Sequence, residues 1–172
     1  ENSTEYNLGF EDSMFKPEKT IYLTLLKNTG IHRLFLATYE LDAPKEESFS
    51  DLWNVCEAFL EGSKEKPRKL AELINTLKAR PFKLKQGVID LWIPTYLIIK
   101  KNDYSLYNDS GVFIPFINRE VLDIMQKSPG GFQIKAFNVE GVKLDLYNKY
   151  REALNLSQDS EFTAASLIET IR

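Results

Sequence analysis

Residues 88–99 (VIDLWIPTYLII) most constrain the fold, because apolar side chains cover almost every flank of the helix that they predict. A helix that is apolar nearly all round is expected in a protein core or against a partner. The run is interrupted by Asp90, Pro94 and Thr95, and it is shorter than the roughly 20 residues of a membrane-spanning helix. We therefore expect residues 88–99 to form a buried spine, in which Pro94 bends the helix or ends its first half.

The residues around this spine predict a helix, a tight turn, a second helix and a two-stranded ribbon over residues 67–117. Apolar side chains repeat with a helical period over residues 67–79, and Arg80–Pro81 stops that helix. The next helix begins near Gln86, and two short strands at 104–107 and 112–117 flank a turn of Asn, Asp, Ser and Gly. This order is the outline of a winged helix-turn-helix.

The remaining patterns predict a mixed α+β protein with a winged helix-turn-helix core, a small antiparallel sheet and additional helices. We expect a helix at 51–61, a helix at 118–127 capped by Asn118, and a strand at 132–137 that joins the ribbon. Val121, Leu122, Ile124 and Met125 are expected to face inward. A last helical region follows from residue 138. The sequence thus divides into an arm and hairpin (1–47), a winged-helix-like domain (48–137) and C-terminal helices (138–172).

The first 47 residues predict an arm followed by a β-hairpin. Residues 1–19 are polar with scattered aromatics, and residues 20–26 (TIYLTLL) fit a strand, although a short buried helix has the same composition. Asn28, Thr29 and Gly30 predict a turn, and residues 31–41 alternate as a second strand. Both faces of this hairpin are fairly apolar, so we expect both to be covered.

Positive charge is concentrated around the predicted helix-turn-helix. Residues 64–101 hold ten basic and three acidic residues, a local charge of +7 in a chain whose formal net charge is −3. Lysine and arginine at such a site displace counterions from nucleic-acid phosphates, but they also simply solvate a helix face and a turn. The candidate phosphate-contacting residues are Lys69, Lys78, Arg80, Lys83, Lys85, Lys100 and Lys101.

Catalytic and metal-binding patterns are missing from the sequence. His32 is the single histidine and has no partner at ligand spacing, and Cys56 lies on the apolar stripe of a predicted helix. No signature of a hydrolase, zinc protease or redox protein occurs. We therefore expect no enzyme activity, no cofactor, no metal and no small-molecule ligand. The single cysteine is typical of a reducing, cytoplasmic compartment.

Two short motifs resemble an accessory segment of known proteins. Pro81, Phe82, Gly87, Val88 and Ile89, followed by the motif residues Leu106, Tyr107, Gly111, Phe113 and Pro115, are similar to a winged-helix segment of large bacterial P-loop NTPases. Those NTPases are associated with phage-defence and restriction-type systems, and the similarity covers residues 51–137. The resemblance implies ATPase activity for a parent protein. The chain itself contains no phosphate-binding loop that could perform it.

Two functional hypotheses follow. The chain opens on Glu1 and closes within an apolar-periodic segment, which predicts an excerpt of a longer polypeptide. We expect a non-catalytic accessory domain that contacts the rest of its parent protein or a protein partner. The alternative is a module that binds DNA, mainly through non-specific phosphate contacts, because the predicted spine lacks a polar face to read bases.

Overall fold

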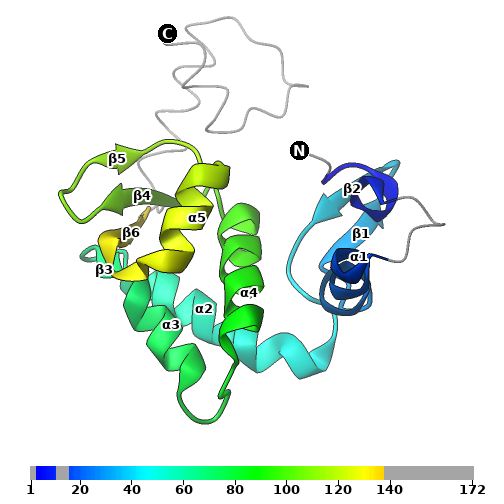
Figure 1. The fold of residues 1–172 in the computed structure, drawn as a ribbon, viewed down its shortest axis with the longest axis horizontal. Coiled ribbons are helices and arrows are strands. Elements are labelled where there is room, and N and C mark those ends of the chain that lie inside the picture. The colour runs from blue at the N-terminus through cyan, green and yellow to red at the C-terminus, as the bar shows by residue number, and fades with distance from the viewer. Residues whose placement is uncertain (1–2, 11–15, 138–172) are drawn as a thin grey trace, which may run out of the picture. The chain divides into compact units, whose positions relative to one another are not determined.

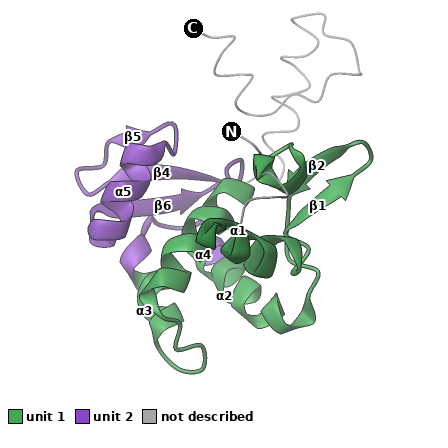
Figure 2. Cartoon of the chain, turned by 45° about the vertical axis from the view of Figure 1, so that its right-hand side comes forward, with its two compact units in different colours: residues 1–59, 72–99 green, residues 60–71, 100–172 purple. Residues whose placement is uncertain are grey.

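The computed structural model describes residues 3–10 and 16–137, which form helices and two small antiparallel sheets (Figure 1). The mixed α+β class is therefore confirmed. Contacts divide the chain into two compact units, drawn in different colours in Figure 2. Unit 1 holds residues 1–59 and 72–99, and unit 2 holds 60–71 and 100–172, so the units do not follow the three predicted segments. The helices predicted beyond residue 137 lie outside the described residues.

The predicted strand at residues 20–26 is wrong, because this segment of unit 1 is helical. Helix α1 (Pro17–Tyr22) continues into a π-helical turn, η2 (Leu23–Lys27). Pro17 occupies the start of the helix, where its missing N–H and fixed φ are favourable. Tyr22 and Leu26 are buried, whereas Thr24, which a strand would place on the same face, is exposed, so burial follows a helical period.

The hairpin forms instead within the segment that was predicted as one strand. Strands β1 (His32–Phe35) and β2 (Thr38–Leu41) pair antiparallel, and Phe35 lies opposite Thr38 across a two-residue loop. Leu36 in that loop has a φ of 52°, a conformation that normally favours glycine or asparagine, so no turn residue marked it. The expectation of a covered hairpin is also wrong: Leu34 and Phe35 are exposed, and Leu36 is 89% exposed.

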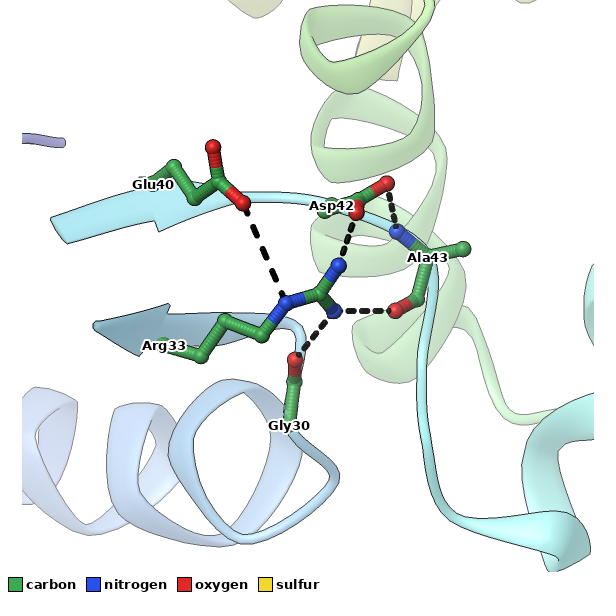
Figure 3. A network of polar contacts seen from close by, with 5 residues as sticks. All are labelled: Gly30, Arg33, Glu40, Asp42 and Ala43. Atoms are coloured by element: carbon green, nitrogen blue, oxygen red, sulfur yellow. Dashed lines mark hydrogen bonds and ion pairs between the residues drawn. The ribbon is translucent and has the colours of Figure 1, made fainter. Parts of the chain in front are cut away.

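Arg33 connects the base of this hairpin to the segments before and after it, through polar contacts with Gly30, Asp42 and Ala43. Its guanidinium donates to the carbonyls of Gly30, at 3.0 Å, and Ala43, at 2.8 Å, and it pairs with the carboxylate of Asp42 (Figure 3). Glu40 lies 3.9 Å from the guanidinium Nε. Gly30 itself has a φ of 75°, as expected of the predicted turn.

The arm at residues 3–10 packs onto the same elements through polar and aromatic contacts. Nε2 of His32 lies 3.0 Å from the carbonyl oxygen of Ser3 and must donate to it, so Nδ1 accepts from the hydroxyl of Tyr22 at 2.8 Å. The ring of His32 stacks on Tyr39. Lys27 donates to the buried side chain of Asn7 at 2.6 Å.

The core of unit 1 is built mainly by residues from three helices. Helix α2 (Ser50–Gly62) follows the short 3-10 turn η3 (Glu47–Phe49), α3 is Leu70–Lys78, and α4 is Gln86–Ile99. Their side chains repeat at helical spacing on the inward faces. The buried members are Leu52, Cys56, Phe59, Leu73, Ile74, Leu77, Ile89, Trp92, Ile93, Tyr96 and Leu97.

The prediction that residues 88–99 form a buried spine is confirmed. Trp92 and Tyr96 are each 1% exposed, and α4 also buries Ile89, Ile93 and Leu97. The helix runs through Pro94 without ending there. Only a few positions of the helix, including Val88 and Ile98, reach the surface.

Unit 2 contains a four-stranded antiparallel sheet in the order β3-β6-β4-β5. Its strands are β3 (Arg68–Lys69), β4 (Tyr104–Asn108), β5 (Phe113–Ile114) and β6 (Phe132–Ala136). Strand β6 buries alternate residues and pairs with β4, as predicted for residues 132–137. Because Arg68 and Lys69 are in β3, α3 begins at Leu70 and not at Pro67.

Helix α5 (Arg119–Lys127) follows β5, and its predicted cap is confirmed: the side chain of Asn118 accepts from the amide of Val121 at 2.9 Å. Of the apolar residues expected to face inward, Met125 is buried, but Ile124 is exposed. The prediction for Ile124 is wrong because the neighbouring position Met125, not Ile124, takes the covered face of this short helix.

Two side chains connect the residue 63–65 turn to β6 within unit 2. The buried hydroxyl of Ser63 donates to the carbonyl of Leu60 at 2.6 Å and accepts from the amide of Ala136 at 3.0 Å. Nζ of Lys135 donates to the carbonyls of Lys64 and Glu65, each at 2.7 Å. The bonds from Lys135 give partners to two carbonyls in the turn after α2, and the Ser63 hydroxyl links the last turn of α2 to β6.

Candidate functional site

Four of the seven basic residues predicted to contact phosphate lie together in unit 1. Lys78 ends α3, and Arg80, Lys83 and Lys85 lie in the connection to α4, which we call the cationic loop (residues 79–85). All four side chains are exposed. Among the described residues, no carboxylate forms an ion pair with any of them. Their charge is therefore available to a ligand.

The other three predicted residues belong to unit 2. Lys69 is exposed on β3, and Lys101 is exposed just after α4. Lys100 forms an ion pair with Asp103 at 3.3 Å. The predicted set is thus divided between the two units, with four residues in unit 1 and three in unit 2.

Backbone hydrogen bonds hold the cationic loop in place. The amide of Leu84 donates to the carbonyl of Leu77 at 2.9 Å, and the amide of Lys83 donates to that of Ala79 at 2.8 Å. Lys83 has a φ of 51°, and the Arg80–Pro81 peptide bond is cis. Tying the loop back to α3 leaves Phe82 and Leu84 half-buried and the basic side chains outside.

An apolar groove with a volume of about 360 Å³ lies against this loop, within unit 1. Its polar lining comes from Ser48 and Asp51, near the start of α2. The rest of the lining is apolar and comes from η2, η3, α2, the cationic loop and the start of α4. These residues are Leu25, Phe49, Leu52, Pro81, Phe82, Leu84 and Val88.

The lining of the groove was not predicted as a site. Phe82 and Leu84 of the cationic loop line the groove. Leu25 was predicted within a strand, and Leu52 within a helix. Segments around residues 25, 50 and 88 carry no shared spacing, so only the folded chain brings them to one surface.

Cys56 and His32, the two residues considered as catalytic candidates from the sequence, are both buried. Burial raises the pKa of the Cys56 thiol to about 12, with Glu57 acting in the same direction and the hydrogen bond from Trp92 opposing it. Burial also lowers the pKa of His32, which the carbonyl of Ser3 opposes. Both ring nitrogens of His32 already have partners. Neither side chain is placed to meet a substrate.

The described residues contain no cluster of three or more histidine, cysteine, aspartate or glutamate side chains that could hold a metal ion. Over the same residues, every helix is too short or too polar to cross a membrane.

No protein-family model matches the chain, and comparison with curated proteins and with solved structures finds no significant match. The resemblance to accessory segments of bacterial P-loop NTPases remains a prediction.

Proposed function

We propose that the chain is a non-catalytic accessory module of a larger bacterial protein, and that it mediates contacts with another domain or subunit. The observation that carries this proposal is the burial of α4: a helix with Trp92 and Tyr96 each 1% exposed serves as a core element. A helix that reads bases needs polar side chains on an outward face, and α4 has almost none.

The proposed core is a winged helix-turn-helix. Support comes from the order of elements, in which α3, the cationic loop and α4 precede the antiparallel pair of β4 and β5, which corresponds to the predicted ribbon. The β4–β5 hairpin would then be the wing.

Exposed apolar side chains support protein contact over nucleic-acid contact. In unit 2, Val112, Phe113 and Phe116 are exposed around β5, which pairs with β4 along one edge. A short edge strand with apolar neighbours is a surface that proteins usually cover. Unit 1 exposes Leu34, Phe35 and Leu36 at the hairpin tip.

The second candidate function is non-specific binding of DNA, and the seven basic residues favour it. Lys78, Arg80, Lys83 and Lys85 have no ion pairs among the described residues, so their charges are available to phosphates. Tyr107 and Phe113 contact one another as a cross-strand pair, which accounts for these aromatics without base stacking.

A titration with DNA separates the two candidates. A fluorescein-labelled duplex of about 20 base pairs is titrated with the protein at low and at moderate ionic strength. The accessory-module proposal expects no saturable binding. Binding at low salt that falls steeply with ionic strength, and that is lost in a variant with Arg80, Lys83 and Lys85 changed to glutamine, would replace it by the second candidate.

Photo-crosslinking tests protein contact directly. A benzophenone amino acid at Phe116, in cells that naturally produce the protein, should give one discrete adduct with a single protein. The same group at Asn102, an exposed polar position of unit 2, is the matched control and should give none. Absence of any adduct from Phe116 and from Leu36 would contradict the proposal.

We also propose a reducing, cytoplasmic compartment. The single cysteine supports this location, because it is buried against Trp92 and is not placed to form an intermolecular disulfide. Mass spectrometry of the protein isolated from its native cells with alkylation at lysis should find Cys56 reduced.

A further inference from the structure

We propose that the apolar groove beside the cationic loop binds an acidic, amphipathic segment of a partner protein. This inference rests on the proposed function and adds the chemistry of the partner to it. The segment would place apolar side chains in the groove and carboxylates against the loop.

The shape and lining of the groove suit side chains from a peptide. Its volume of about 360 Å³ lies in the usual range for binding sites. Phe49, Leu52, Phe82 and Val88 contribute apolar surface from four elements: η3, α2, the cationic loop and α4. Amphipathic helices bind such grooves through anchors spaced three or four residues apart.

Among the charged residues that line the groove or directly neighbour its lining in the sequence, the cations Arg80, Lys83 and Lys85 outnumber the carboxylates Glu47 and Asp51, which favours an acidic ligand. Along the cationic loop, lining residues alternate with exposed cations: Arg80 precedes Pro81, Lys83 separates Phe82 from Leu84, and Lys85 follows. Each cation is therefore within a residue of the groove lining, and none has an ion pair among the described residues. Carboxylates of a docked segment would complement these charges and accelerate its association.

The lining argues against a nucleic acid at the same place. Asp51, in the first turn of α2, also lines the groove, and its carboxylate would repel a phosphate chain that extended across it. The apolar side chains offer phosphates no hydrogen bonds. A segment with carboxylates on one flank and apolar anchors on another avoids both problems.

Two designed peptides provide the probe. Each has about 18 residues with leucine at the i, i+3, i+4 and i+7 positions of a helix, and the remaining positions are glutamate in one peptide and lysine in its twin. Fluorescence anisotropy measures binding of each labelled peptide to the full chain. We expect the acidic peptide to bind at least about tenfold more tightly than its basic twin. Its affinity should fall several-fold as salt screens the charges.

Variants then locate the binding surface. Val88 and Ile98 lie on the same helix and are 39% and 40% exposed, but only Val88 lines the groove. Val88→Asp should weaken binding of the acidic peptide by about tenfold or more, and Ile98→Asp by less than about twofold. Circular dichroism should show that both variants are folded, because the two side chains are similarly exposed.

The charge contribution has its own control. Changing Arg80, Lys83 and Lys85 together to glutamine should lower the affinity for the acidic peptide by about tenfold. Changing the exposed Lys16 and Lys45 to glutamine is the control, and it should leave that affinity unchanged within about twofold. Equal binding of the two peptides, no binding of the acidic peptide at about 0.1 mM, or equal effects of the two aspartate variants would overturn the inference.

Failure of this inference is distinguishable from failure of the proposed function. An adduct from Phe116 of unit 2 with an empty groove would leave the accessory role standing and remove the acidic partner. Salt-dependent binding of the duplex that is lost in the triple glutamine variant would remove both.

Discussion

The indole Nε1 of Trp92 donates a hydrogen bond to the thiol sulfur of Cys56 across 3.3 Å, in the core of unit 1. The two residues lie 36 positions apart, on α4 and α2, and both are buried. Trp53 adds edge-to-face contacts to Trp92 and Tyr96. This cluster joins the spine, α4, to α2.

Replacement of Trp92 should therefore be costly. Trp92→Phe removes the donor and leaves a cavity, and we expect the free energy of unfolding in urea to fall by about 2–4 kcal/mol. Trp53→Phe, at a half-buried position, should lower it by less. If the free energy of unfolding fell equally in the two variants, the burial of Trp92 and its hydrogen bond to Cys56 would add nothing beyond the effect of a half-buried tryptophan.

Alkylation of Cys56 should report opening of this core. Because burial raises the pKa of the thiol to about 12, almost no thiolate exists at pH 8 in the folded protein. Iodoacetamide should modify the native protein at least about 100-fold more slowly than the protein in urea, as measured by intact mass. Rapid modification of the native protein would mean that Cys56 is accessible.

Acid should destabilise the attachment of the arm. Burial lowers the pKa of His32 below its ordinary value, and Lys27 adds to the effect, so below about pH 6.5 the unfolded chain takes up a proton more readily than the folded chain. The contribution of His32 is thus fully present above pH 6.5. It is lost as the pH falls from there to the folded pKa.

His32→Gln isolates this effect, since glutamine can still donate to Ser3 and accept from Tyr22 but does not titrate in this range. The difference in melting temperature between wild type and variant should move in favour of the variant between pH 7.5 and pH 5. Parallel pH profiles for the two proteins would show that protonation of His32 is not coupled to folding.

Ser63 should be the polar residue on which β6 depends. Ser63→Ala leaves the buried amide of Ala136 without its acceptor, and we expect the free energy of unfolding to fall by about 1–3 kcal/mol. Ser110→Ala, at an exposed turn of the same unit, should change stability by less than about 0.5 kcal/mol. Amide exchange at Ala136 measures the loss locally, and an unchanged exchange rate would refute the role of Ser63.

Much of the fold could be predicted where local pattern and burial agree. The alternation of residues 132–136 indicated β6, and Asn118 marked the start of α5. The apolar residues of 88–99 indicated a buried helix, because no face was left for water. In each case the local preference and the tertiary environment favour the same conformation.

The N-terminal errors arose where local preference was ambiguous. Residues 20–26 suit a strand or a helix equally by composition, and in the folded chain Tyr22 and Leu26 are buried while Thr24 between them is exposed, which fits a helix and not a strand. The turn at Leu36 carries no glycine, asparagine or aspartate, so nothing in the sequence marked where β1 reverses into β2. Pairing along the hairpin and the bonds of Arg33 at its base hold that turn.

By itself, the sequence determined that the chain has a buried apolar helix, a small antiparallel sheet and a cluster of positive charge after the second predicted helix. These properties depend on periodicity and composition, which are local. Only the tertiary structure decided that Leu52, Phe82 and Val88 share one groove, beside cations that form no ion pair with any described residue, and that the Ser63 hydroxyl accepts from the amide of Ala136. Such contacts join residues tens of positions apart, and no spacing along the chain records them.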